Sequence, residues 1–175
     1  MQYRTFGKLD WKVSALGFGC MRLPTIDGKA GSINEAEATR MIRTAIDQGV
    51  NYFDTAYVYH EKMSEVALGK ALLDGYRQKV RIATKLPVWM CNEPADFDKL
   101  LNEQLQKLQT DHIDFYLLHA LNEDSWKNKV LGLDMLRSVE AVMQDGCIGH
   151  ICFSFYDKLE VFKQIVDYYY NWTFV

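Results

Sequence analysis

Four residues with chemically reactive side chains stand at or just after the end of a short apolar run in this sequence: Asp54, Tyr59, Lys85 and His119. The runs span residues 50–53, 80–83 and 113–118 and are rich in residues that favour β-strands. Each run is followed by a helical pattern, as in arrays of parallel strands joined by helices. The carboxyl ends of such strands meet on one face, so that residues about thirty positions apart converge. We therefore expect an acid, a phenol, an amine and an imidazole to form one site of acid–base chemistry.

The elements that must position these residues recur along the chain. The apolar runs predict strands at residues 16–20, 50–53, 80–83, 113–118 and 148–154, and the beginning of a sixth strand at 172–175. Amphipathic spacing predicts helices at residues 32–48, 64–74, 97–108, 135–143 and 159–169. Residues 3–6 and 11–14 alternate like a β-hairpin outside the array. Two α/β architectures fit this order: an incomplete (β/α)8 barrel, or an open doubly wound sheet.

Composition is that of an ordinary globular protein, with 49% hydrophobic and 25% charged residues and a net charge of −3. No basic stripe favours nucleic acid, and no polybasic cluster or long apolar run favours a membrane. The four cysteines form no Cys-x-x-Cys pair, so we expect a reduced, cytoplasmic protein without a metal site. No linker is apparent, and residues 1–175 are expected to form a single domain, with the hairpin at 1–15 and βα units at 16–175.

The segment from Asn51 to Tyr59 reads Asn-Tyr-Phe-Asp-Thr-Ala-Tyr-Val-Tyr, and Lys85 and His119 follow at the next two strands. As a set, these residues resemble the aldo-keto reductase superfamily, and the resemblance extends from the hairpin to the fifth strand. It implies a (β/α)8 barrel, bound NADP(H) or NAD(H), and reversible reduction of a small carbonyl substrate. It also implies that Tyr59 is the acid, that Lys85 and Asp54 tune it, and that His119 orients the substrate.

Elementary chemistry supports these roles. Hydride transfer to a carbonyl leaves an alkoxide unless a proton is delivered, and an unperturbed phenol, with a pKa of about 10, is a poor acid at neutral pH. An ammonium group about 4 Å from a phenolate stabilises it by roughly 4 kcal/mol at an effective dielectric constant of about 20. A carboxylate can hold that ammonium in place, and a neutral imidazole can donate a hydrogen bond to the carbonyl oxygen.

Taken singly, each residue has an ordinary structural role. Asp54 could cap a turn, Tyr59 could be a packing aromatic, and Lys85 could be a solvated surface group. His119 could be a core histidine with satisfied hydrogen bonds. Their coincidence at successive strand ends favours the site. His60 and His112 have no such support, and we expect them to be structural.

The resemblance also implies cofactor contacts: Gly19, Cys20, Met21, Asp54 and Ser154. Glycine permits close approach of the backbone to a ring, although a tight turn explains Gly17 and Gly19 equally well. Phe155 stands where the family has a polar residue, and residues 145–150 depart from its more basic Lys-x-Gly-x-Ile-Arg pattern. Arg22 and Trp89 are possible contacts at the rim of the site.

The resemblance covers five units and the start of a sixth, so we expect an incomplete barrel. Loops that bind the cofactor's pyrophosphate and adenosine in this family follow later strands, and we expect no appreciable turnover from the 175-residue chain alone. Open strand edges could lead to self-association. The opening Leu-Gly-Phe-Gly-Cys-Met-Arg-Leu-Pro also resembles reductases with a C-terminal iron–sulfur domain, although no such cysteine motif lies in this chain.

Three hypotheses remain. The chain could belong to an active NAD(P)H-dependent reductase, or it could be an inactive reductase-like fragment that binds a nucleotide or a protein. The third hypothesis is an unrelated open α/β sheet in which the four-residue match is accidental. Nucleotide binding and aldehyde reduction separate the first two, and strands arranged around a curved axis would separate both from the third.

Overall fold

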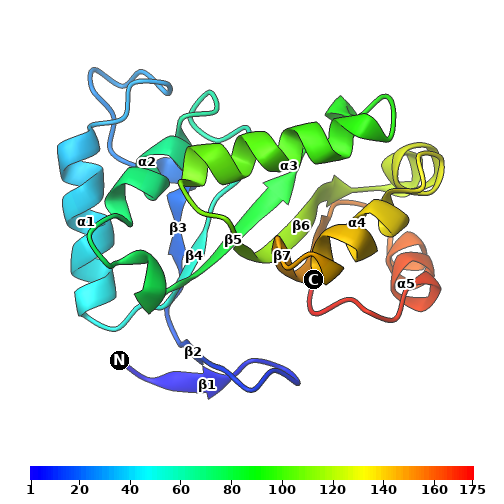
Figure 1. The fold of residues 1–175 in the computed structure, drawn as a ribbon, viewed down its shortest axis with the longest axis horizontal. Helices are drawn as coiled ribbons and strands as arrows, with labels where there is room; N and C mark the ends of the chain where they lie inside the picture. The colour runs from blue at the N-terminus through cyan, green and yellow to red at the C-terminus, as the bar shows by residue number, and fades with distance from the viewer. The chain divides into compact units, whose positions relative to one another are not determined.

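The computed structural model describes residues 1–175, in which parallel strands alternate with helices along the chain (Figure 1). The chain divides into two compact units, one with residues 1–84 and 104–110 and the other with residues 85–103 and 111–175. The alternation confirms the predicted α/β class. The expectation of a single domain stays a prediction.

The first unit begins with the predicted hairpin, which is confirmed. Strands β1 (Tyr3–Thr5) and β2 (Lys12–Ser14) pair in antiparallel orientation. The side-chain amide of Asn51 fastens this hairpin to the start of the next element, because its Nδ2 donates to the carbonyl of Lys12 and its Oδ1 accepts from the amide of Ser14. The hairpin thus lies outside the parallel strands yet is tied to them.

Three parallel strands follow: β3 (Phe18–Gly19), β4 (Tyr52–Asp54) and β5 (Arg81–Leu86), of which β5 runs from the first unit into the second at Lys85. Their register places Gly19 opposite Asp54, and Asp54 opposite Ala83. Helix α1 (Glu35–Asp47) buries one face, and its N-terminus is capped by the side chain of Asn34. It packs against α2 (Ser64–Ala71), which lies beside it in Figure 1.

Helix α3 (Ala95–Leu108) begins in the second unit and ends in the first. The second unit also holds β6 (Ile113–Leu121), α4 (Met135–Gln144), β7 (Ile148–Phe155) and α5 (Leu159–Tyr168). Strands β6 and β7 pair in parallel with an irregularity between Leu118 and Leu121. Ala120 lies within it and has a left-handed backbone, with φ of 55°.

Several boundaries differ from those predicted. β5 and β6 extend to Leu86 and Leu121, so Lys85 and His119 lie within strands, near their ends. The expected sixth strand at residues 172–175 is wrong: this segment forms no strand, and the amide of Thr173 makes a single backbone hydrogen bond, of 3.0 Å, to the carbonyl of Ile151. The polar loop after β6 contains an unpredicted π-helical segment, η4 (Ser125–Leu131). Three short 3₁₀ turns complete the chain: η1 (Cys20–Arg22), η2 (Arg77–Lys79) and η3 (Val88–Met90).

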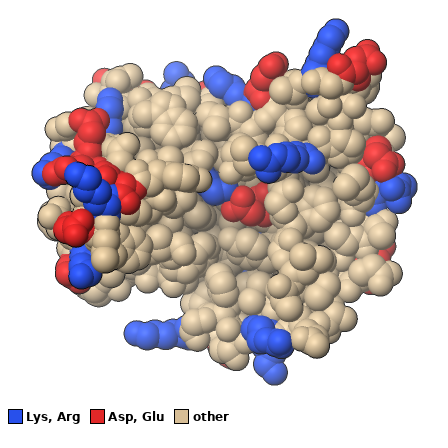
Figure 2. All heavy atoms as spheres, turned by 180° about the vertical axis from the view of Figure 1, so that it is seen from behind, with Lys and Arg blue, Asp and Glu red and all other residues tan.

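The surface carries both signs of charge. On the face shown in Figure 2, acidic and basic side chains lie close to one another, and neither forms a continuous patch. None of the helices combines the length and the apolar character that crossing a bilayer requires. All four cysteines are free thiols.

Candidate active site

Asp54 ends β4, where the strands of the first unit expose their carboxyl ends. It is half-buried and lies in register between Gly19 and Ala83. The amide of the next residue, Thr55, donates to the carbonyl of Ala83 at 2.8 Å and so continues the pairing with β5. The sheet register therefore places Asp54 at a defined position on the strand-end face, as the sequence predicted.

Tyr59 lies in the turn that joins β4 to α2 and is half-buried. Its amide donates to the carbonyl of Ala56, and its own carbonyl accepts from the amide of Ser64, each at 3.2 Å. The following three residues, at 60–62, all have positive φ, between 51° and 74°. Left-handed backbone is unfavourable for residues other than glycine, so the structure around Tyr59 must compensate for this turn.

His60 is the first of these left-handed residues, and its ring ties the turn to the backbone of the preceding loop through two hydrogen bonds. Its Nε2 accepts a hydrogen bond from the amide of Leu23 at 2.9 Å, which requires Nδ1 to carry the proton that is donated to the carbonyl of Ala30 at 2.8 Å. His112 likewise bonds through Nδ1 to the carbonyl of Gly146. These contacts agree with the structural roles expected for both histidines.

The other two candidates belong to the second unit. Lys85 lies on β5, and His119 lies on β6, the next strand along the chain. The side chain of Lys85 is buried, with the residue only 6% exposed, which is rare for a lysine and unlike a solvated surface group. His119 is half-buried, and its ring lies 5.2 Å from that of Trp89, centroid to centroid. Burial, and to a smaller extent the nearby charge of Lys85, lowers the pKa of His119 to about 4.

The expected cofactor residues of the first βα loop differ in exposure. Gly19 has no atom within 4 Å of the position that a Cβ would occupy, so its backbone faces open space. Met21 is exposed. Cys20 is fully buried, and its carbonyl accepts from the hydroxyl of Ser64 at 2.9 Å. Only Gly19 and Met21 therefore present accessible surface, and the thiol of Cys20 belongs to the core.

Ser154 lies near the end of β7, and its Oγ accepts from the amide of Ala120 at 2.7 Å. This bond satisfies a backbone group that the irregularity in β6 removes from the strand ladder, directly after His119. Because the hydroxyl oxygen of Ser154 acts as the acceptor in this bond, its proton can still be donated to a second group. Its neighbour Phe155 packs on Phe153 and Phe162, which accounts for an aromatic residue at this position.

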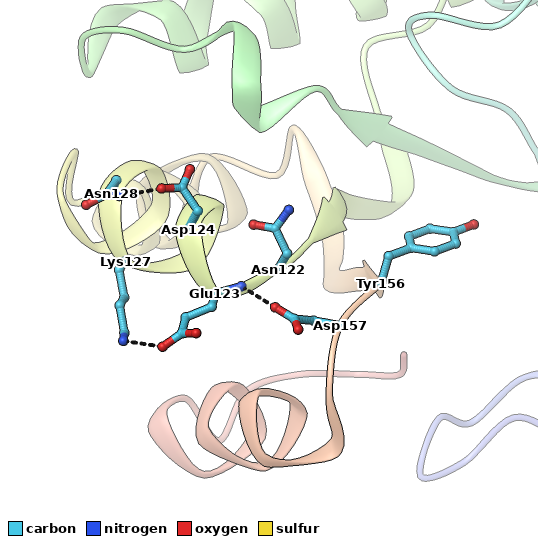
Figure 3. A pocket seen from close by; sticks show the side chains of 7 residues that line it. All are labelled: Asn122, Glu123, Asp124, Lys127, Asn128, Tyr156 and Asp157. Carbon is cyan, nitrogen blue, oxygen red and sulfur yellow. Dashed lines mark hydrogen bonds and ion pairs between the residues drawn. The ribbon is translucent and has the colours of Figure 1, made fainter.

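A shallow pocket of about 610 Å³ lies at the carboxyl ends of β6 and β7 (Figure 3). Its rim is mostly polar, and its lining residues come from the loop after each strand: Asn122, Glu123, Asp124, Lys127, Asn128, Tyr156 and Asp157. The carboxylate of Asp157 accepts from the amide of Glu123 at 2.8 Å and joins the two loops. The second unit thus opens a polar pocket at its strand-end face.

The sequence analysis missed a buried polar group in the first unit. Glu65 is fully buried at the start of α2 and accepts hydrogen bonds from Thr84 and Gln104. No motif marked these residues, because a glutamate in the first turn of a helix is ordinarily exposed. The sequence analysis named Trp89 only as a possible contact at the rim of the site and did not predict that its ring lies against His119.

Comparison with known proteins identifies a family. The sequence model of the aldo/keto reductase family matches residues 15–174. L-galactose dehydrogenase of Arabidopsis thaliana is 29% identical over 174 residues, which are 95% of this chain and 52% of that protein. This chain thus spans about half the length of that curated relative.

Solved structures agree. An aldo-keto reductase from Bacillus halodurans, in its holo form, is 31% identical and matches with a TM-score of 0.77 over 95% of this chain and 54% of its own. An aldo-keto reductase from Klebsiella pneumoniae in complex with NADPH is 25% identical, with a TM-score of 0.75 over 95% of this chain and 54% of its own. The fold is therefore that of part of an aldo-keto reductase barrel, which confirms the predicted incomplete (β/α)8 architecture over the open sheet.

Proposed function

Because the chain belongs to the aldo/keto reductase family, we propose that it carries the proton-transfer residues of an NAD(P)H-dependent oxidoreductase that reduces aldehydes and ketones to alcohols. One observation carries the proposal: the family match spans residues 15–174 and includes all four candidate residues, Asp54, Tyr59, Lys85 and His119. The similar reductase from Klebsiella pneumoniae is in complex with NADPH, so we assign NADP(H) or NAD(H) as the cofactor.

In the proposed reaction the nicotinamide supplies the hydride. The hydroxyl of Tyr59 gives its proton to the carbonyl oxygen as that oxygen gains negative charge, and the ammonium of Lys85 stabilises the phenolate left behind. Asp54 holds the ammonium in position. His119, neutral because its pKa is about 4, donates one N–H to the substrate oxygen.

Strand register supports this grouping. Asp54 is paired with Ala83, and Lys85 follows Ala83 by two positions along β5. Side chains two positions apart on a strand point to the same face. The low exposure of Lys85 adds to this, since a buried ammonium needs a compensating group, and a carboxylate is the simplest one.

The cofactor fits the residues present in the first unit. A planar ring needs close approach to the backbone, and the open space at Gly19 provides it. Gly19 is directly paired with Asp54, so a ring held there would lie beside the proposed catalytic carboxylate. Gly19, Met21 and Ser154 remain the proposed contacts for the nicotinamide end, whereas Cys20 is fully buried and is no longer proposed as a contact.

The cysteines support a reducing compartment, and we propose the cytoplasm. Burial raises the pKa of Cys91 to about 11 and that of Cys152 to about 12, so both thiols stay protonated and are poor nucleophiles at neutral pH. These cysteines fill the core.

The test is NADPH oxidation with a small aldehyde by the protein that carries this chain. Tyr59→Phe removes the proton donor and keeps the ring, so we expect the rate of carbonyl reduction to fall by about 10²-fold or more. The affinity for NADPH, measured by fluorescence titration, should change little. Lys85→Met should lower the rate in the same way.

Tyr76→Phe is a matched control, because the hydroxyl of Tyr76 bonds to the exposed side chain of Asp47 at 3.2 Å, away from the strand ends. It should retain full activity. Nucleotide binding without turnover would favour the alternative of an inactive binding module, and turnover that survives Tyr59→Phe would reject the assigned proton donor.

A further inference from the structure

Helix α2 begins with two consecutive polar residues, Ser64 and Glu65, and both are fully buried. The hydroxyl of Ser64 donates to the carbonyl of Cys20 and therefore accepts from Thr55, whose Oγ1 lies 2.9 Å away. The amide of Ser64 donates to the carbonyl of Tyr59. The start of α2 thus holds the end of β3, the end of β4 and the turn of Tyr59 at once.

Glu65 extends these contacts to β5 and α3. Its Oε1 accepts from the hydroxyl of Thr84 and from the side-chain amide of Gln104, each at 2.6 Å. Its Oε2 lies 3.6 Å from the ammonium of Lys107. Thr84 directly precedes Lys85 along β5, so this carboxylate fixes the strand up to the residue before the proposed catalytic lysine.

Lys107 carries the same network to the turn that holds Tyr59. Its ammonium lies 3.7 Å from the ring centroid of Tyr57, a buried residue two positions before Tyr59. A cation at this distance over an aromatic face is attracted to it, and more strongly where water is excluded. One ammonium therefore both compensates the charge of Glu65 and holds the aromatic side chain of the turn.

Helices α2 and α3 pack closely enough for Glu65 to reach Gln104 and Lys107. Gly69 follows Glu65 by one helical turn on the same face of α2, and a Cβ there would lie 2.5 Å from the backbone carbonyl oxygen of Lys107. Only glycine permits this approach of α2 to the end of α3. The close packing is what brings Glu65 within reach of Gln104 and Lys107.

Stability alone does not explain a carboxylate at this position. Burial raises the pKa of Glu65, against the lowering effect of Thr84, Gln104 and Lys107, which means that desolvation of the charge is costly. Apolar side chains of similar volume often replace buried ion pairs without loss of stability. A charge with several directional partners can instead specify one arrangement of the elements that it joins.

We propose that Glu65 is a positioning residue for the reductase site: through Thr84 it fixes the strand that carries Lys85, and through Lys107 and Tyr57 it fixes the turn that carries Tyr59. The inference rests on the proposed function for its consequence in catalysis. Its structural part, the anchoring of the turn at residues 55–63, is independent of any activity.

The test uses Glu65→Gln, which removes the charge, and Thr84→Val, which removes one hydroxyl at constant shape, in the protein that carries this chain. Misplacement of reacting groups by about 1 Å can cost about 10²-fold in rate, so we expect kcat to fall by about tenfold or more in each variant. KM for the aldehyde and Kd for NADPH should change by less than about twofold. Amide hydrogen exchange measured by mass spectrometry should become faster in residues 55–63 and stay unchanged in residues 148–155.

Lys70→Gln is the matched control, because it breaks an exposed ion pair, Lys70–Glu35, at the end of the same helix. It should alter neither kcat nor exchange. If both test variants only lower the melting temperature, with kcat per folded molecule and exchange in the turn unchanged, Glu65 is merely structural and the inference is wrong. If the parent protein shows no turnover, the proposed function fails, and the exchange result alone decides whether Glu65 anchors the turn.

Discussion

At the scale of single residues, His119 shows how burial selects one protonation state. An exposed histidine is partly protonated near neutral pH, whereas this half-buried ring, against Trp89 and near the charge of Lys85, is held neutral. A neutral imidazole has one donor and one acceptor nitrogen, so it can donate to a carbonyl oxygen without adding a second cation to a site that already holds an ammonium.

The same shift predicts a pH dependence of stability. The pKa of His119 is about 4 in the folded chain against 6.5 for an ordinary histidine, so the unfolded chain binds more protons between these values. The free energy of unfolding must then rise with pH across this window and be lost as the pH falls from 6.5 towards 4. Urea unfolding at about pH 7.5 and about pH 4.5 should show a smaller loss in His119→Gln than in the parent. A His119 ring resonance that titrates at an ordinary pH in NMR would contradict this.

The sequence predicted the reactive residues better than the residues that support them. Asp54, Tyr59, Lys85 and His119 were recognisable because their types and order follow the strand pattern. Glu65 was not, because its partners Gln104 and Lys107 lie about forty positions away and its burial arises only when α2 and α3 pack together. The burial of Lys85 could not be predicted from the sequence either, because it also arises from tertiary packing.

At the scale of elements, apolar runs were sufficient to locate each parallel strand, whereas their ends depended on tertiary contacts. β6 continues past Leu118 because Ser154 supplies the hydrogen bond that the irregularity at Ala120 removes. Residues 172–175 look like a strand, but the indole of Trp172 bonds to the carbonyl of Ile165 and packs 4.8 Å from Phe153. Side-chain packing at this segment therefore prevails over β-propensity.

The turn after Tyr59 gives a prediction at this scale. Glu61 is exposed and has φ of 53°, a conformation that costs an L-residue about 1–2 kcal/mol and costs glycine little. Glu61→Gly should therefore raise the free energy of unfolding by about 0.5–1 kcal/mol after the larger entropy of glycine in the unfolded chain is counted. Glu61→Val should lower it by about 1 kcal/mol or more, because a β-branched side chain fits this region worst.

Lys163→Gly in α5 serves as the control for glycine itself. Lys163 is exposed in a helix interior, so this change should lower the free energy of unfolding by about 1 kcal/mol. Urea denaturation of the three variants measures all these differences. Equal effects of glycine at residues 61 and 163 would show that the turn is not strained in solution.

At the scale of the whole molecule, the second unit combines a large aromatic cluster with exposed apolar side chains. Trp172 contacts Phe153, Trp126 and Tyr169 inside the cluster. Five large hydrophobic or aromatic residues of this unit are more than half exposed: Tyr156, Leu159, Tyr168, Tyr170 and Val175. Exposed apolar side chains that lie together on one face often mark a surface that another chain covers.

We expect the 175-residue chain to self-associate through this surface. Leu159 and Val166 are two turns apart on α5 and so lie on one face of the helix, where they form an exposed apolar stripe. Sedimentation velocity from about 1 to about 100 µM should show a weight-average sedimentation coefficient that rises with concentration, as mass action requires. Leu159→Lys combined with Val166→Lys should suppress the rise, because two cations on the stripe repel those of a second copy and must be desolvated on contact. Ile26→Lys, at an exposed apolar position in the first unit, should leave it unchanged. A stable monomer across the whole range would exclude this association and leave the stripe as ordinary exposed surface.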